Sequence, residues 1–165
     1  MEVTEEKFKE ALGLFPTGVV VITCQKYRGQ DVGITVSSFS SVSLAPPQIL
    51  FCLSKSSRTM LAFAESNYFT VNILSASQKL ISENFARRVF LESVIVNTFQ
   101  DIKTNCFLIK DALSHIICEK GNVYDEGDHL IILGKVQRVS IGPKNLPLIR
   151  HSREYLTTKS LVSEE

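Results

Sequence analysis

The sequence predicts a mainly β protein, an antiparallel barrel that is closed or nearly closed and carries a few short peripheral helices. Three observations support this fold class. Apolar, β-branched runs are short and end at turn-forming residues. Helical patterns are too few and too scattered for repeated strand-helix-strand units. A length of 165 residues with 44% apolar content matches one ordinary globular domain, so we expect a single domain over residues 1–165.

Three strands are expected in the first third of the chain. The β-branched run from Gly18 to Cys24 lies between "FPTG" and the turn-rich "KYRGQD", as in a hairpin. The run from Val32 to Ser43 alternates apolar and polar residues until Phe39 falls out of step. A shift of one residue predicts a bulge or bend there, a feature that often re-aims side chains near a site. After "APP", residues 48–54 form the third strand.

Helices and strands then alternate loosely. "SRTMLAFAES" has the spacing of a short helix, and "YFTVNIL" that of a fourth strand. Ser75 and Gln78 have the spacing of a capping box, which predicts that a helix begins there. Two long apolar runs, 115–124 and 129–141, flank the turn "DEGD" and predict a late hairpin.

Composition excludes several classes of protein. With 18 Lys and Arg against 17 Asp and Glu, the net charge of +1 gives no broad electrostatic surface for nucleic acid or an anionic membrane. The N-terminal residues are acidic and helix-like, and no run has membrane-spanning length, so we expect a cytoplasmic protein. The four cysteines lie far apart in or beside apolar runs without a CxxC pair, which argues against a metal site or disulfides.

Familiar catalytic motifs are absent, and a polar cluster stands out in their place. The sequence contains no GxGxxG after a strand, no GxxxxGK[ST] and no HExxH. Two blocks of small hydroxyl residues, "TVSSFSS" (35–41) and "SKSSRT" (54–59), lie on neighbouring expected strands. The second block comes where a strand gives way to a helix, so backbone N–H groups together with Lys55 or Arg58 could hold a phosphate. The alternative is purely structural, with Ser57 as an N-cap, Lys55 as a solvating charge and a half-exposed serine-rich strand.

A resemblance to a known family favours the phosphate site. "FPTGVVVIT", "GITVSSFSSVSLAPPQILFCLSKSSRT", "FTVNILSASQ" and "EGDHLIILGKV" resemble, in order, the motifs of the flavin reductase-like family of FMN-binding split-barrel proteins. The resemblance covers residues 14–86 and 116–136. It implies an antiparallel split barrel of the Greek-key, FMN-binding type that forms a homodimer with the flavin near the interface.

The family's activity is the next implication. The resemblance implies an NAD(P)H:flavin oxidoreductase that reduces FMN, or FAD, with NADH or NADPH and supplies a flavin-dependent monooxygenase or another electron acceptor. The spacing of the cysteines and histidines, and not the resemblance, is the ground for expecting no metal. Two alternatives stay open at this point: an FMN-binding electron carrier, similar to flavoredoxin, without turnover of free flavin, and a small barrel that binds another phosphate-bearing ligand.

The resemblance also assigns roles to single residues. The segment 35–38 matches the lining of the flavin ring, residues 52–54 the strand beside it, and residues 57–59 the phosphate end, with Lys55 as a weaker candidate. His129 in "GDH" matches a histidine on the nicotinamide side, where its structural alternative is a turn histidine paired with Asp128. Asn72 also matches, but an Asn on a strand is as often structural. The expected cofactor-binding residues are Thr35, Val36, Ser37, Ser38, Cys52, Leu53, Ser54, Lys55, Ser57, Arg58, Thr59, Phe85 and Ala86, and the nicotinamide-binding ones are His129, also the catalytic candidate, and Tyr155.

The sequence departs from the family pattern in two places. Residues 87–113 lack the Gly- and Pro-containing approach to a strand that relatives usually have. The tail "PLIRHSREYL" keeps Pro147, Leu148 and Tyr155 but replaces the aromatic pair that commonly follows "PL". We therefore expect a flavin site close to the family pattern and a nicotinamide site that differs from it.

Overall fold

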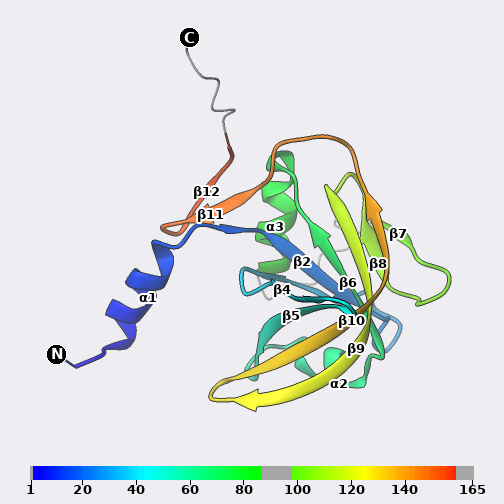
Figure 1. Ribbon diagram of the computed structural model, residues 1–165, viewed down its shortest axis with the longest axis horizontal. Helices are drawn as coiled ribbons and strands as arrows, with labels where there is room; N and C mark the ends of the chain where they lie inside the picture. The colour runs from blue at the N-terminus through cyan, green and yellow to red at the C-terminus, as the bar shows by residue number, and fades with distance from the viewer. Residues whose placement is uncertain (1, 87–97, 159–165) are drawn as a thin grey trace, which may run out of the picture.

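The structure is a computed structural model that describes residues 2–86 and 98–158. Figure 1 shows a rolled sheet with short helices around it. The helices are α1 (Glu5–Gly13), α2 (Met60–Glu65) and α3 (Lys79–Ala86), with a 3-10 turn η1 (Ala76–Gln78) before α3. The strands are β1 (Thr17–Gly18), β2 (Val20–Cys24), β3 (Gly33–Val36), β4 (Ser40–Leu44), β5 (Pro47–Ser54), β6 (Tyr68–Ile73), β7 (Thr98–Gln100), β8 (Phe107–Ile109), β9 (Ser114–Glu126), β10 (His129–Ile141), β11 (Ile149–His151) and β12 (Glu154–Leu156).

The main sheet is antiparallel and has seven strands in the order β3-β2-β6-β9-β10-β5-β4. Its two edge strands, β3 and β4, are joined by a link of only three residues, 37–39. The four Cα steps from Val36 to Ser40 cover at most about 14 Å, so the two edges must approach each other. The sheet therefore rolls into a barrel that is split between β3 and β4, which confirms the predicted fold class.

The expected single strand over 32–43 is wrong in one respect. The structure divides this run into β3 and β4, which lie at opposite edges of the sheet. The phase shift at Phe39 marks the three-residue link between them rather than a bulge within one strand. Because periodicity reports only which face of a strand is buried, it could not show that the strand changes partner.

The late hairpin is confirmed. β9 and β10 each contain 13 residues and pair along almost their whole length, with two register irregularities. Gly127 takes a φ of +58° in the turn between them, a conformation that suits glycine. The start of β10 also pairs with the end of β5, so this turn lies beside the turn that follows β5.

The barrel interior is filled by apolar side chains from β2, β5, β6 and α2. Phe51 makes edge-on contacts with Phe63 and Phe69, at centroid distances of 5.7 and 5.2 Å. All five residues of β2 are buried, because alternate side chains face the barrel and a second apolar cluster outside it. That second cluster consists of Val19, Val21, Leu74, Ile109 and Leu148, with Ile81, Phe85 and Tyr155 packed against it.

Two of the short helices, α2 and α3, are each held by specific hydrogen bonds. Lys120 of β9 donates a hydrogen bond to the carbonyl oxygen of Phe63 at 3.0 Å and so holds the C-terminal turn of α2. Ser75 and Gln78 form the predicted capping box before α3.

Two short pairings, β7 with β8 and β11 with β12, were not predicted from the sequence. Within the described residues, no helix is long and apolar enough to cross a membrane.

The cysteines are free thiols. Cys24, Cys106 and Cys118 are buried, and burial raises the pKa of their thiols to about 12, 11 and 12. Thiols with such raised pKa values are protonated at neutral pH and inert as nucleophiles. Cys52 is only partly buried and faces away from the barrel interior.

Candidate functional site

The predicted flavin-ring residues lie where the 37–39 link crosses β5. The Ser38 hydroxyl accepts a hydrogen bond from the Cys52 backbone N–H at 2.9 Å and lies 3.2 Å from the Cys52 carbonyl oxygen. Burial alternates along β5, so the Leu53 side chain is in the barrel core while Cys52 and Ser54 face outward. Leu53 can therefore offer a ligand only its backbone. The N–H groups of Ser37 and Ser38 lie outside the strand ladders.

The other side of β3 is held by α3. The Thr35 hydroxyl donates to the Ser82 carbonyl oxygen at 2.7 Å. Phe85 packs so closely on Gly33 that a Cβ there would lie 3.0 Å from the Phe85 ring. The same ring stacks on Phe107 at a centroid distance of 6.0 Å. Phe85 thus belongs to the packing between α3 and β3, whereas Ala86, at the end of α3, is exposed.

The turn between β5 and α2 gathers hydroxyl groups. Ser54 and Ser56 share a hydrogen bond of 3.0 Å between their hydroxyls, and Ser57 and Thr59 share one of 2.8 Å. The N-cap of α2 is Thr59, and the Ser57 hydroxyl accepts from the Thr59 N–H at 3.2 Å. The purely structural alternative expected Ser57 to be the N-cap, whereas the N-cap lies two residues later in the chain, at Thr59. Arg58 is exposed within this turn.

Lys55 points from this turn toward the β9–β10 hairpin. Its ammonium forms an ion pair with Asp125 and donates to the Gly127 carbonyl oxygen at 2.6 Å. Its backbone N–H donates to the Asp128 carbonyl oxygen at 3.0 Å. Lys55 thus ties the β5–α2 turn to the hairpin turn, and its charge faces the hairpin.

His129 lies directly beside the hydroxyl-rich turn. It is the register partner of Ser54 across β5 and β10, and its side chain is partly exposed. Its Nδ1 lies 2.7 Å from the Asp128 carboxylate. This hydrogen bond, together with the charge that His129 carries when protonated, lowers the pKa of Asp128. Asp128 therefore orients the imidazole and leaves Nε2 free of that contact.

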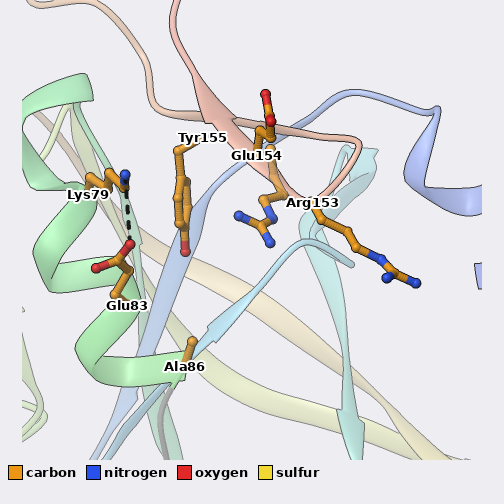
Figure 2. Close-up of a pocket in the computed structure, with 7 residues that line it drawn as sticks. Lys79, Glu83, Ala86, Arg153, Glu154 and Tyr155 are labelled. Carbon is orange, nitrogen blue, oxygen red and sulfur yellow. Dashed lines mark ion pairs between the residues drawn. The ribbon is translucent and has the colours of Figure 1, made fainter. Parts of the chain in front are cut away.

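Tyr155 lines a pocket that runs along one side of α3. The pocket has a volume of about 600 Å³ and lies between α3 and the β11–β12 hairpin. Figure 2 shows the Tyr155 ring standing between Lys79 of α3 and Glu154 of the hairpin. The Tyr155 hydroxyl lies 2.8 Å from the Ser82 hydroxyl. The residues that line the pocket are Lys79, Glu83, Ala86, Arg150, Arg153, Glu154 and Tyr155.

The predicted residues thus fall along one path. It runs from α3 over Thr35 and the 37–39 link to Cys52, and then to Ser54 and His129. Tyr155 joins the path through Ser82, and no hydrogen bond, ion pair or ring contact between described residues links it to His129. Backbone N–H groups at the link, with hydroxyls and Arg58 at the β5–α2 turn, form a donor set that fits a flavin ring and its phosphate. Among the described residues, no cluster of His, Cys, Asp or Glu could hold a metal ion.

Sequence reasoning missed Ser82 and the basic residues of the pocket. Ser82 is fully buried and contacts both Thr35 and Tyr155. The signal was present, because Gln78, Ser82 and Phe85 have helical spacing and so place a polar residue on the buried face of α3. Lys79, Arg150 and Arg153 gave no such signal, since single basic residues in a sequence read as ordinary surface charges.

Comparison with known proteins gives one family. The profile described as flavin reductase like domain matches residues 12–159. An FMN reductase (NADH) of Agrobacterium fabrum is 37% identical over 138 residues, which cover 81% of this chain and 75% of the relative. The reductase component of 4-hydroxyphenylacetate 3-monooxygenase from Thermus thermophilus is 31% identical over 151 residues, 92% of this chain and 95% of the relative.

Solved structures of flavin reductases have the same fold as this chain. A Streptomyces globisporus NADH:FAD oxidoreductase in complex with NAD and FAD fragments superposes with a TM-score of 0.88 at 27% identity, covering 98% of this chain and 99% of the other. The chain spans only 41% and 55% of the lengths of two other relatives, both from Rhizobium meliloti.

Proposed function

Because the chain belongs to the flavin reductase like domain family, we propose that it is an NAD(P)H:flavin oxidoreductase that reduces FMN and delivers it to a partner monooxygenase. The observation that carries this proposal is the pairing of Ser54 with His129, which places a hydroxyl-rich turn and an oriented imidazole side by side. When bound, a flavin supplies the ring that accepts hydride from the reduced nicotinamide.

The β5–α2 turn is proposed to hold the flavin phosphate. Ser57 and Thr59 supply hydroxyl donors, and Arg58 supplies a guanidinium that can form charge-assisted hydrogen bonds. Lys55 keeps the turn in place through Asp125 and Gly127. FMN is proposed ahead of FAD because this turn offers an arginine and several hydroxyls to a terminal phosphate group.

The 37–39 link is proposed to hold the flavin ring. Ser38 fixes the link to β5 through the Cys52 backbone, and Thr35 fixes β3 to α3. With both side chains engaged in this way, the backbone N–H groups of the link are presented in a rigid arrangement. Preorganised donors of this kind stabilise negative charge as it develops on a bound group. The chain contributes binding, orientation and electrostatics, for which no acid-base pair is needed.

The visible absorption of the protein mixed with FMN tests this proposal. Addition of NADH or NADPH without oxygen is expected to bleach the oxidised flavin, and excess free FMN is expected to be turned over many times. Bleaching of one equivalent only would favour the electron carrier. A protein that does not take up FMN would favour a different phosphate-bearing ligand.

His129 is proposed to position the nicotinamide. Hydride transfer takes no proton from the imidazole, so His129→Ala is expected to raise KM for NADH about five- to tenfold and to slow flavin reduction, with FMN affinity unchanged. Steady-state kinetics and an FMN titration measure these quantities. Gln137→Ala, at an exposed position later on β10, serves as the control. Loss of FMN binding or a much lower Tm in His129→Ala would instead identify a structural histidine.

We further propose a homodimer with the flavin near its interface. A barrel this small cannot easily enclose a whole flavin and a nicotinamide. In addition, α1 has no buried residue although it carries Phe8 and Leu12, and Phe15 just after it is 72% exposed. Figure 1 shows α1 extending away from the barrel. A helix of nine residues is marginal in water by itself, so contact with a second copy would explain its apolar face.

Light scattering tests the dimer. Leu12→Glu places a charge on the apolar face of α1 and is expected to shift the protein toward the monomer. Glu10→Ala changes the opposite face and is expected to leave the dimer intact. A wild-type monomer that binds and fully reduces FMN would contradict the proposal.

A further inference from the structure

We propose that Asp125, near the tip of the β9–β10 hairpin, is a positioning residue that holds the Lys55 ammonium in competition with the flavin phosphate and so limits the affinity for FMN. The inference rests on the proposed function and deepens it, because a flavin that is delivered to a partner monooxygenase has to leave the reductase. Of the two cations in the β5–α2 turn, Arg58 is assigned to the phosphate, whereas the Lys55 ammonium is held by the hairpin.

The hairpin engages the Lys55 ammonium at two points. The ammonium forms an ion pair with the Asp125 carboxylate and donates a hydrogen bond to the Gly127 carbonyl oxygen at 2.6 Å. Lys55 nevertheless belongs to the β5–α2 turn and precedes Ser57 closely in the sequence. Because lysine carries its charge on a long flexible stem, the same ammonium can also turn toward a phosphate that this turn holds.

Water reaches both partners of this ion pair. The Lys55 side chain is 37% exposed, and the Asp125 side chain is 74% exposed. Such an exposed ion pair contributes little to stability, because water and salt screen the attraction between the charges. A phosphate monoester carries about two negative charges at neutral pH, so it is a strong partner for an ammonium. To reach it, the Lys55 ammonium must first give up its pair with Asp125, and FMN binds less tightly by that cost.

The β5–α2 turn has other contacts that keep its conformation. The Lys55 backbone N–H donates to the Asp128 carbonyl oxygen at 3.0 Å, and the Ser57 N–H donates to the Ser54 carbonyl oxygen at 3.0 Å. The pairing of β5 with β10 also extends to Ser54. These backbone contacts do not involve the Asp125 carboxylate. Its replacement is therefore expected to change the direction of one ammonium and to leave the turn in place.

The neighbouring carboxylates of the hairpin do not hold Lys55. The Asp128 carboxylate lies 2.7 Å from Nδ1 of His129. Glu126 forms no ion pair with any residue that the structure describes. Glu126 is exposed at the position after Asp125 and carries the same charge. It therefore provides a matched control for the loss of one negative charge from the hairpin.

Titration of the apoprotein with two flavins tests the inference. Asp125→Asn is expected to bind FMN about fivefold more tightly than the wild type and to release it about fivefold more slowly, because the phosphate gains a charge-assisted contact. Riboflavin has no phosphate, so its affinity is expected to stay within about twofold. Flavin fluorescence measures both affinities, and stopped-flow dilution measures the release. A merely structural role for Asp125 would instead weaken the binding of both flavins and lower the Tm.

Three further variants show whether Asp125 acts through Lys55. Asp125→Glu keeps a carboxylate beside the ammonium and is expected to retain the wild-type affinity for FMN within about twofold. Glu126→Gln is expected to retain it as well. In a Lys55→Met background, the addition of Asp125→Asn is expected to change the FMN affinity by less than about twofold, because the ammonium is absent.

The inference and the proposed function can fail separately. Unchanged or weaker FMN binding in Asp125→Asn would overturn the inference, and so would equal tightening with and without the Lys55 ammonium. A wild type that binds FMN but does not reduce it with NADH or NADPH would overturn the proposed function, whatever these affinities are. A wild type that takes up no FMN would overturn both.

Discussion

Replacing Arg58 by alanine is expected to weaken FMN binding by about 1.5–3 kcal/mol, roughly ten- to a hundredfold, because a charge-assisted contact to the phosphate is lost. Riboflavin lacks the phosphate, so its affinity should stay within about twofold. The Ser57 and Thr59 hydroxyls would remain in place, since they bond to each other. Titration of the apoprotein with each flavin measures both affinities.

The control for this variant is Arg28→Ala, which removes a charge from the turn after β2. Its FMN affinity should equal that of the wild type. Equal losses of FMN and riboflavin binding in Arg58→Ala would show that Arg58 acts through the fold. Unchanged FMN binding would place the phosphate away from the β5–α2 turn.

Replacing Asn72 by leucine is expected to lower the free energy of unfolding by about 2–4 kcal/mol, because two buried backbone groups lose their partners. The side-chain amide donates to the Val21 carbonyl oxygen at 2.9 Å and accepts from the Ile109 N–H at 2.9 Å. Asn72 is fully buried, so water cannot replace these bonds. Chemical denaturation measures the change.

Asn122→Leu provides the matched comparison, since Asn122 is exposed on β9. Its free energy of unfolding should change by less than about 0.5 kcal/mol. An Asn72→Leu variant as stable as the wild type, but unable to bind FMN, would reveal a ligand contact instead. The structure supports the structural alternative for this residue, which links β6 to β2 and β8.

Periodicity and turn residues predicted most of the barrel. Strands β2, β5 and β6 are apolar runs that end at turn signals, and the capping box before α3 involves residues only three apart. The β9–β10 hairpin follows from two long apolar runs around Gly127. These features depend on neighbours in sequence, so the sequence contains the information that determines them.

Strand pairing between segments that are far apart in the sequence was harder to predict from the sequence. The β7–β8 and β11–β12 strands have three residues each, too few to show a period of two. The division of residues 32–43 between two sheet edges is decided by the rolling of the whole sheet. Part of the divergent segment 87–113, at 87–97, lies outside the described residues.

By itself, the sequence determined that hydroxyl groups and an arginine gather where β5 ends, because a strand followed by a helix creates such a turn locally. Only the tertiary structure decided which of these groups face a ligand. Lys55 turns to Asp125, 70 positions away, and Ser82 joins Thr35 to Tyr155 across three elements. The direction of a side chain depends on the partner that satisfies its charge or hydrogen bond, and for these residues folding brings that partner from a distant part of the chain.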